Sequence, residues 1–86
     1  AAGPLSLLAN GLVQKAQGRT RAARRWLRRC AAAARERRTR YVEARAHLEL
    51  ALLPDASAAE HARLARSLLQ PLDAPRELQR LPGQGS

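Results

Sequence analysis

Arginine is the residue type in this chain with the clearest chemical potential. Ten arginines fall within the 22 residues RTRAARRWLRRCAAAARERRTR, from 19 to 40. Such a run is either a surface that binds a polyanion or the solvated side of a packed helix. An acidic protein and the phosphates of a nucleic acid are both suitable polyanions. The candidate binding residues are the six arginines that share one helix face: Arg21, Arg24, Arg25, Arg28, Arg29 and Arg35.

The other reactive residue types do not form a recognisable chemical site. Cys30 is the single cysteine, and His47 and His61 are isolated in the sequence, without partners at metal-ligand spacing. Paired carboxylates, a glycine-rich phosphate loop and a nucleophile arrangement are missing from the sequence. We therefore expect no enzymatic activity, no cofactor and no metal, and we interpret these three residues as structural or surface residues.

The positive charge is concentrated in one half of the chain. Residues 1–40 carry Lys15 and ten arginines against Glu36, a net charge of +10, whereas residues 41–86 carry five arginines against six acids, a net charge of −1. A lone cysteine indicates a reducing compartment, so we expect a cytoplasmic protein. No apolar run approaches the roughly 20 residues that a membrane span needs.

The elements that would position these side chains are predicted to be helices only. The sequence is rich in alanine and leucine and poor in β-branched residues, which predicts an all-α protein. Helical periodicity and short connections predict two antiparallel hairpins, about residues 4–36 and 40–70, and a short capping helix over 74–81. We expect one domain over residues 1–82 and a polar tail over 83–86.

Turn and capping residues mark the predicted helix ends. Gly18 should end the first helix, and Thr20 should cap the second, which spans residues 20–36. Asp55 or Ser57 should cap the fourth helix, and Ser57 and Glu60 have the spacing of a capping box. Asp73 should cap the fifth helix, with Pro75 in its first turn.

Apolar stripes predict which side of each helix is buried. The first helix has the stripe Leu5, Leu8, Ala9, Leu12 and Ala16. The second separates its arginines from Ala23, Trp26, Leu27, Cys30, Ala31 and Ala34. The third, over residues 40–53, has two opposite stripes: Tyr41, Ala44, Leu48, Ala51 and Leu52, and Val42, Ala46, Leu50 and Leu53. We therefore predict that the third helix packs between its neighbours and is the most buried, with Arg45 and Glu49 paired in the gap.

The two predicted hairpins align with each other at a period of about 35 residues. Ala23, Leu27 and Cys30 recur as Ala58, Ala62 and Ala65, and Gly11 recurs as Ala46. The segment NGLVQKAQG places two glycines seven apart, and AARRWLRRC has small, large and small residues in sequence. Over about residues 5–81 the chain resembles degenerate tetratricopeptide repeats of large bacterial signalling ATPases and transcriptional regulators. It departs from them at Asn10 and Gln14, where the family has a large apolar and an aromatic residue.

The resemblance implies a helical scaffold for protein–protein contact, a kind of TPR-like α-solenoid fragment. We expect a fragment or subunit of a larger regulator or assembly, whose partner is an acidic protein or further repeats of the same chain. Two hairpins fall below the three repeats that a stable array normally needs, so the edge helices should meet a partner. The alternative is a small basic nucleic-acid-binding or ribonucleoprotein component that uses the arginine face. Lysine, which usually accompanies arginine in that class, occurs once.

Overall fold

A computed structural model of the chain describes residues 3–81, and every regular element in that range is a helix. The helices are α1 (Pro4–Ala16), α2 (Thr20–Glu36), α3 (Arg40–Ala51), α4 (Ala58–Leu69) and α5 (Pro75–Arg80), with a short 3-10 turn, η1 (Gln70–Leu72), before α5. The predicted all-α class is confirmed. The third helix ends two residues earlier than predicted, and the predicted polar tail over 83–86 lies outside the described residues.

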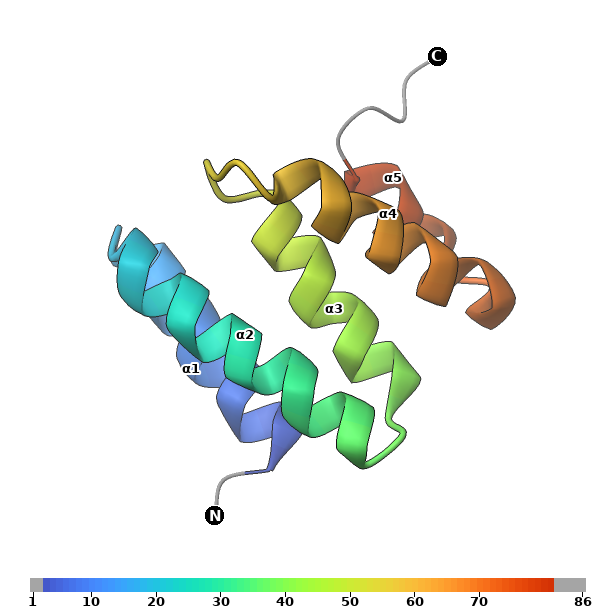
Figure 1. Ribbon diagram of the computed structural model, residues 1–86, viewed down its shortest axis with the longest axis horizontal. Coiled ribbons are helices and arrows are strands. Elements are labelled where there is room, and N and C mark those ends of the chain that lie inside the picture. The colour runs from blue at the N-terminus through green and yellow to red at the C-terminus, as the bar shows by residue number, and fades with distance from the viewer. Residues whose placement is uncertain (1–2, 82–86) are drawn as a thin grey trace.

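The helices form two antiparallel hairpins that stand side by side (Figure 1). α1 packs against α2, and α3 packs against α4, as predicted. The second hairpin joins the first mainly through the contact of α2 with α3, while α5 touches α3 and α4. Most packing therefore joins helices that are neighbours along the chain, and α3 lies at the centre.

Two turns of the same type end α1 and α2. After α1 the backbone of Gly18 is left-handed (φ 76°), its N–H donates to Lys15 O at 3.0 Å, and Arg19 N donates to Gln14 O at 2.9 Å. This pattern is a Schellman motif, in which glycine is favoured, so the prediction for Gly18 is confirmed.

Arg38 occupies the corresponding position after α2. Its φ is 57°, its N–H donates to Arg35 O at 3.2 Å, and Thr39 N donates to Ala34 O at 2.9 Å. A residue with a Cβ costs about 1 kcal/mol in this left-handed conformation. The second Schellman motif therefore carries a strain that the first one avoids.

The predicted side-chain caps are wrong. Thr20 is already the first residue of α2, and the residue before it, Arg19, makes no side-chain cap. Ser57 precedes α4 as predicted, but its hydroxyl donates to Asp55 Oδ2 at 3.1 Å and accepts no hydrogen bond from the helix. Asp55, the other candidate, accepts the N–H of Ser57 at 3.3 Å and caps no N–H within α4. Asp73 adopts a left-handed conformation (φ 53°) that ends η1, so Ala74 stands at the start of α5.

The core consists of two clusters on opposite sides of α3. One side of α3 packs on the first hairpin through Val42, Ala46 and Leu50, with Leu53 following the helix. The other side packs on α4 and α5 through Ala44, Leu48 and Ala51. The prediction that α3 packs between its neighbours is confirmed, although Tyr41, at the start of the second stripe, is 43% exposed.

The predicted buried side of α1 is confirmed for Leu8 and Leu12 and is wrong for Leu5, Ala9 and Ala16. The buried residues are Pro4, Leu7, Leu8 and Gly11, whereas Leu5 is 68% exposed and Ala9 and Ala16 are exposed. A Cβ on Gly11 would lie 2.7 Å from Leu27 Cδ2, so the glycine permits a close contact between α1 and α2. Because this contact fixes which side of α1 faces α2, Leu8 and Leu12 of the predicted stripe lie against the core, while Leu5, Ala9 and Ala16 are turned toward solvent.

Candidate functional site

The structure divides the six candidate arginines between two sides of α2. Arg24 and Arg28 reach the loop after α3, and Arg35 lies near α4. Arg21 and Arg25 are exposed elsewhere on the helix surface. The six residues therefore share a helix, as predicted, but they do not form one uniform surface.

Asp55 engages two of these arginines. Arg24 Nε lies 2.9 Å from Asp55 Oδ2, and Arg28 Nη2 lies 3.6 Å from the same oxygen. Arg24 also donates to the carbonyl of Pro54 at 3.0 Å. Hydrogen bonds from the Ser57 N–H and hydroxyl, then the charges of Arg24 and Arg28, lower the pKa of Asp55. Arg24 therefore joins the loop between α3 and α4 to α2, and the more exposed Arg28 adds a longer ion pair.

Arg29 belongs to the outer side of α2, where its guanidinium carbon lies 5.1 Å from the centroid of the Trp26 ring. Trp26 is half-buried and packs against the edge of the first core cluster, so its interpretation as a packing residue agrees with the structure. A cation over an indole face contributes about 0.5–1 kcal/mol at an exposed site.

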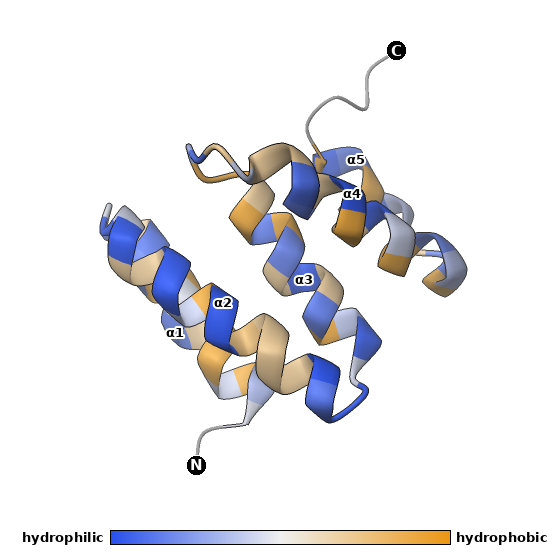
Figure 2. Ribbon diagram, viewed as in Figure 1, coloured by the Kyte–Doolittle hydropathy of each residue, from blue (hydrophilic) through white to orange (hydrophobic). Residues whose placement is uncertain are grey.

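A groove lies between α2 and α4, and α3 forms its floor. It consists of two hollows of about 640 and 220 Å³ that share Arg35, Glu43 and Leu64. The lining residues from α2 are Ala31, Ala32 and Arg35; those from the turn and α3 are Arg38, Arg40, Glu43 and His47; those from α4 are Leu64, Ser67 and Leu68. In Figure 2 the alanine run of α2 separates the blue arginine-rich segments at either end.

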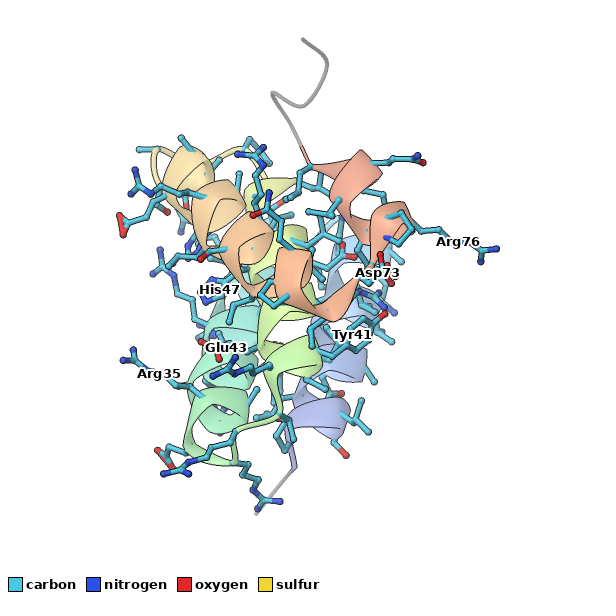
Figure 3. All side chains as sticks on the ribbon, turned by 90° about the vertical axis from the view of Figure 1, so that its right-hand side faces the viewer. Arg35, Tyr41, Glu43, His47, Asp73 and Arg76 are labelled. Atoms are coloured by element: carbon cyan, nitrogen blue, oxygen red, sulfur yellow. The ribbon has the colours of Figure 1, made fainter. Side chains whose placement is uncertain are left out.

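The groove has an excess of positive charge. Within residues 3–81, no carboxylate lies within 4 Å of Arg35, Arg38 or Arg40, and all three are exposed. Glu43 is the one acidic residue of the lining. Figure 3 shows Glu43 and His47 between α2 and α4, with Arg35 pointing outward beside them. These guanidinium groups are therefore available to an anion from outside the chain.

His47 and His61 form a pair that joins α3 to α4 next to the groove. Their Nδ1 atoms lie 3.0 Å apart, and their ring centroids lie 5.1 Å apart with an angle of 25° between the ring planes. Burial, and then the neighbouring His61, lower the pKa of His47 to about 4, although Glu43 Oε2 lies 4.0 Å from His47 Nε2. Burial and the charge of Arg28 also lower the pKa of His61. Both imidazoles are neutral at pH 7, and one ring N–H donates to the other ring.

The expectation that these histidines are isolated is therefore wrong. The fold pairs them because they lie on facing sides of α3 and α4. Their separation of 14 residues in the sequence does not reveal this contact. No group of three or more His, Cys, Asp or Glu side chains suited to a metal ion occurs in the described part of the chain.

Cys30 is buried in the first core cluster, and its thiol donates to the carbonyl of Pro4 at 3.3 Å. Burial raises the pKa of Cys30 to about 11. Because the thiolate is the nucleophilic form, this thiol is unreactive at neutral pH, which agrees with its interpretation as a structural residue.

Glu49 is the buried charge that sequence reasoning missed. Its side chain is 2% exposed and accepts hydrogen bonds from Lys15 Nζ at 2.7 Å and from Arg80 Nη2 at 2.9 Å. The predicted partner Arg45 is more distant, at 3.7 Å. Burial opposes ionisation, but the hydrogen bonds and charges of Lys15 and Arg80 outweigh it and lower the pKa of Glu49. This network joins α1, α3 and α5 away from the groove.

Comparison with known proteins gives no match to a protein-family model, to a curated protein or to a solved structure. Within residues 3–81, no helix combines the length and the apolar character that crossing a membrane requires.

Proposed function

We propose that this chain is a non-catalytic module for protein–protein contact, a helical scaffold of the tetratricopeptide type that binds an acidic partner protein. The observation that supports this proposal best is the groove between α2 and α4. There three arginines that have no carboxylate partner among residues 3–81 border an apolar wall formed by Leu64 and Leu68. The packed hairpins on both sides fix the backbone positions of these arginines before a partner arrives, so that binding has to order mainly their side chains.

The packing of the hairpins supports a repeat scaffold. Gly11 lets α1 approach α2 closely, and Ala46, its counterpart in the second hairpin, is fully buried. Cys30 and Ala65 also correspond in the alignment, and both are fully buried at helix contacts. Small residues at equivalent positions are what a stack of similar hairpins requires.

The state of the reactive side chains supports a non-catalytic role. The thiol of Cys30 is buried and protonated, and the carboxylate of Glu49 is neutralised by surrounding cations. The two histidines are bonded to each other. A general base or nucleophile needs a free position within reach of a substrate, and these groups are occupied by internal contacts.

Nucleic-acid binding is a second candidate, favoured by the outer side of α2. Arg21 and Arg25 are exposed there, and Arg29 lies over the ring of Trp26. Cations next to an aromatic ring occur in single-strand-binding surfaces. The ring of Trp26 is half-buried in the core, however, and one such ring offers no continuous stacking platform.

Selection from a display library of short random peptides, with and without an excess of single-stranded RNA, tests the proposed function. At about 0.15 M salt, we expect acidic peptides to be enriched and to stay bound when RNA is added. Failure to enrich any peptide, together with RNA binding that weakens steeply with salt, would refute the proposal. That salt dependence reflects counterion release, with a log–log slope of about one unit for each phosphate contact.

A further inference from the structure

We infer that the groove between α2 and α4 is a two-part site for an acidic segment of a partner protein that carries a leucine-sized apolar side chain. Arg35, Arg38 and Arg40 bind its carboxylates, while Leu64 and Leu68 bind the apolar side chain. This inference rests on the proposed function and specifies the part of the surface and the partner chemistry.

Charge determines the first part of the site. Three arginines and one acidic residue, Glu43, line the larger hollow, and the exposed Arg35 points outward at its edge. A ligand with a single negative charge, such as a fatty acid, leaves at least one of these cations without a partner. Guanidinium groups bind carboxylates through paired, charge-assisted hydrogen bonds, so a segment with two or more acidic residues is the better match.

The apolar wall determines the second part. Leu64 is 40% exposed and Leu68 is half-buried. Leu64 lines the smaller hollow with Ala31 and Ala32, and both leucines line the larger hollow with Arg35. Small residues on α2 leave room for an inserted side chain next to the leucines. Bare phosphates have no group to cover this wall, whereas a leucine of a partner segment would remove it from water.

The groove also lacks what a nucleic acid would use. Neither Trp26 nor Tyr41 lines it: Trp26 packs on the first core cluster, and the Tyr41 hydroxyl donates to Glu77 of α5. Figure 3 shows Tyr41 on the other side of α3, toward α5. The side chain of His47 is only 13% exposed and is hydrogen-bonded to His61. Exposed bases would therefore find no free aromatic face in the groove.

Arg38 supplies an independent argument from the backbone. Gly18 holds the corresponding position of the turn after α1, where a left-handed conformation is free of strain. At the end of the groove the same position carries an arginine despite the strain of its positive φ. Strained residues of this kind cluster at sites of function, and here the strain places a guanidinium group at the mouth of the groove.

Two variants with the same change in net charge test the inference. The groove variant combines Arg35→Gln, Arg38→Gly and Arg40→Gln; the control combines Arg21→Gln, Arg25→Gln and Arg29→Gln on the outer side of α2. The probe is the acidic peptide most enriched from the random library, labelled for fluorescence polarisation. We expect the groove variant to bind it about tenfold or more weakly, and the control to keep affinity within about threefold, since non-specific attraction alone would weaken both equally.

Changes in the probe and a single substitution complete the test. Replacing the probe's acidic residues by amides, or its leucine-sized residue by serine, should each reduce its affinity for the protein. Arg38→Gly alone should weaken probe binding without lowering the midpoint of thermal unfolding, because glycine relieves the positive φ. That result separates the loss of a binding group from a loss of folding.

The possible results separate this inference from the proposed function. Equal loss of affinity in the groove and control variants, or enriched peptides without acidic residues, would overturn the groove assignment and leave a protein-binding role standing. Absence of any enriched peptide would overturn both proposals. Loss confined to the control variant would move the binding surface to the outer side of α2 and refute the inference.

Discussion

Lys15 and Glu49 form the shortest ion pair between distant parts of the chain, with 2.7 Å between Nζ and Oε1. Glu49 is the one buried charged residue among those described, and Lys15 is the single lysine of the sequence. The pair joins α1 to α3, and Arg80 adds α5 at 2.9 Å. An ionised carboxylate in the interior requires such partners, because an unpaired buried charge is strongly unfavourable.

Glu49→Ala should therefore destabilise the protein by about 2–3 kcal/mol. Breaking a fully buried pair costs about 3–5 kcal/mol, but Lys15 and Arg80 are 31% and 44% exposed and can reach water after the change. Urea unfolding measures the loss. Glu60→Ala on the exposed surface of α4 is the control, and a cost for Glu49→Ala as small as that of the control would contradict the network.

Gly11→Ala tests the close contact of α1 with α2. The added Cβ would lie 2.7 Å from Leu27 Cδ2, and Leu27 is fully buried and has little room to move. Overpacking costs about 1–3 kcal/mol, which exceeds the gain of about 0.5–1 kcal/mol from replacing a helical glycine by alanine.

A double-mutant cycle with Leu27→Ala supplies the control for this contact. Leu27→Ala removes the atoms that an added Cβ would meet, so the two substitutions together should cost less than the sum of their separate effects. Strictly additive free energies of unfolding would show that Gly11 does not set the distance between the helices.

The histidine pair predicts that stability falls as pH falls from about 6.5 to 4. The unfolded chain has histidines of ordinary pKa, whereas the folded pKa of His47 is about 4, so protons bind preferentially to the unfolded state in this window. Each pKa unit of difference corresponds to about 1.4 kcal/mol, which gives a loss on the order of 2–3 kcal/mol from His47. His61 has a lowered pKa and acts in the same direction.

His47→Gln should flatten this part of the pH profile, as measured by urea unfolding at a series of pH values. The contribution of Glu49 appears at lower pH. Because folding lowers the pKa of Glu49, its contribution to stability is lost as the pH falls below 4.5, the pKa of this group in the unfolded chain, and the carboxylate is protonated. If the loss of stability between pH 6.5 and 5 persisted unchanged in His47→Gln, the titration would have to be assigned elsewhere.

The outer arginines should contribute little to folding. Arg21 and Arg25 are exposed and have no carboxylate within 4 Å among residues 3–81. Their joint replacement by glutamine should change the free energy of unfolding by less than about 0.5 kcal/mol, with a slight gain from the removal of i, i+4 repulsion. Arg24→Gln removes the ion pair with Asp55 and the hydrogen bond to the Pro54 carbonyl. It should lower the free energy of unfolding by measurably more in the same denaturant titration.

The fold was predictable from local patterns. Two apolar stripes on α3 predicted a helix packed on both sides, and the structure distributes those residues between two core clusters. Gly18 and Pro75 marked helix ends correctly because their conformational preferences are intrinsic to the residue. The rotation of α1 was not predictable, since it depends on a contact between Gly11 and Leu27 that periodicity does not describe.

The candidate site was predictable only in part, because its residues meet through the fold. The sequence identified Arg35 on α2 but placed Arg38 in a turn and Arg40 at the start of the next helix, with no reason to group them. The apolar wall comes from α4, about 30 residues away from Arg35 in the sequence. The pairing with Asp55 removed Arg24, which is 23% exposed, from the predicted surface for the same reason, whereas Arg28 remains 57% exposed.

The most direct test of a groove that binds an acidic partner is nuclear magnetic resonance of the arginine Nε–Hε groups during titration with the enriched peptide. Carboxylate binding changes the environment of each guanidinium group that it touches. We predict shifts at Arg35, Arg38 and Arg40, while Arg21 and Arg25 remain unchanged. Shifts confined to Arg21 and Arg25, or shifts that appear with RNA and not with any acidic peptide, would contradict the central claim.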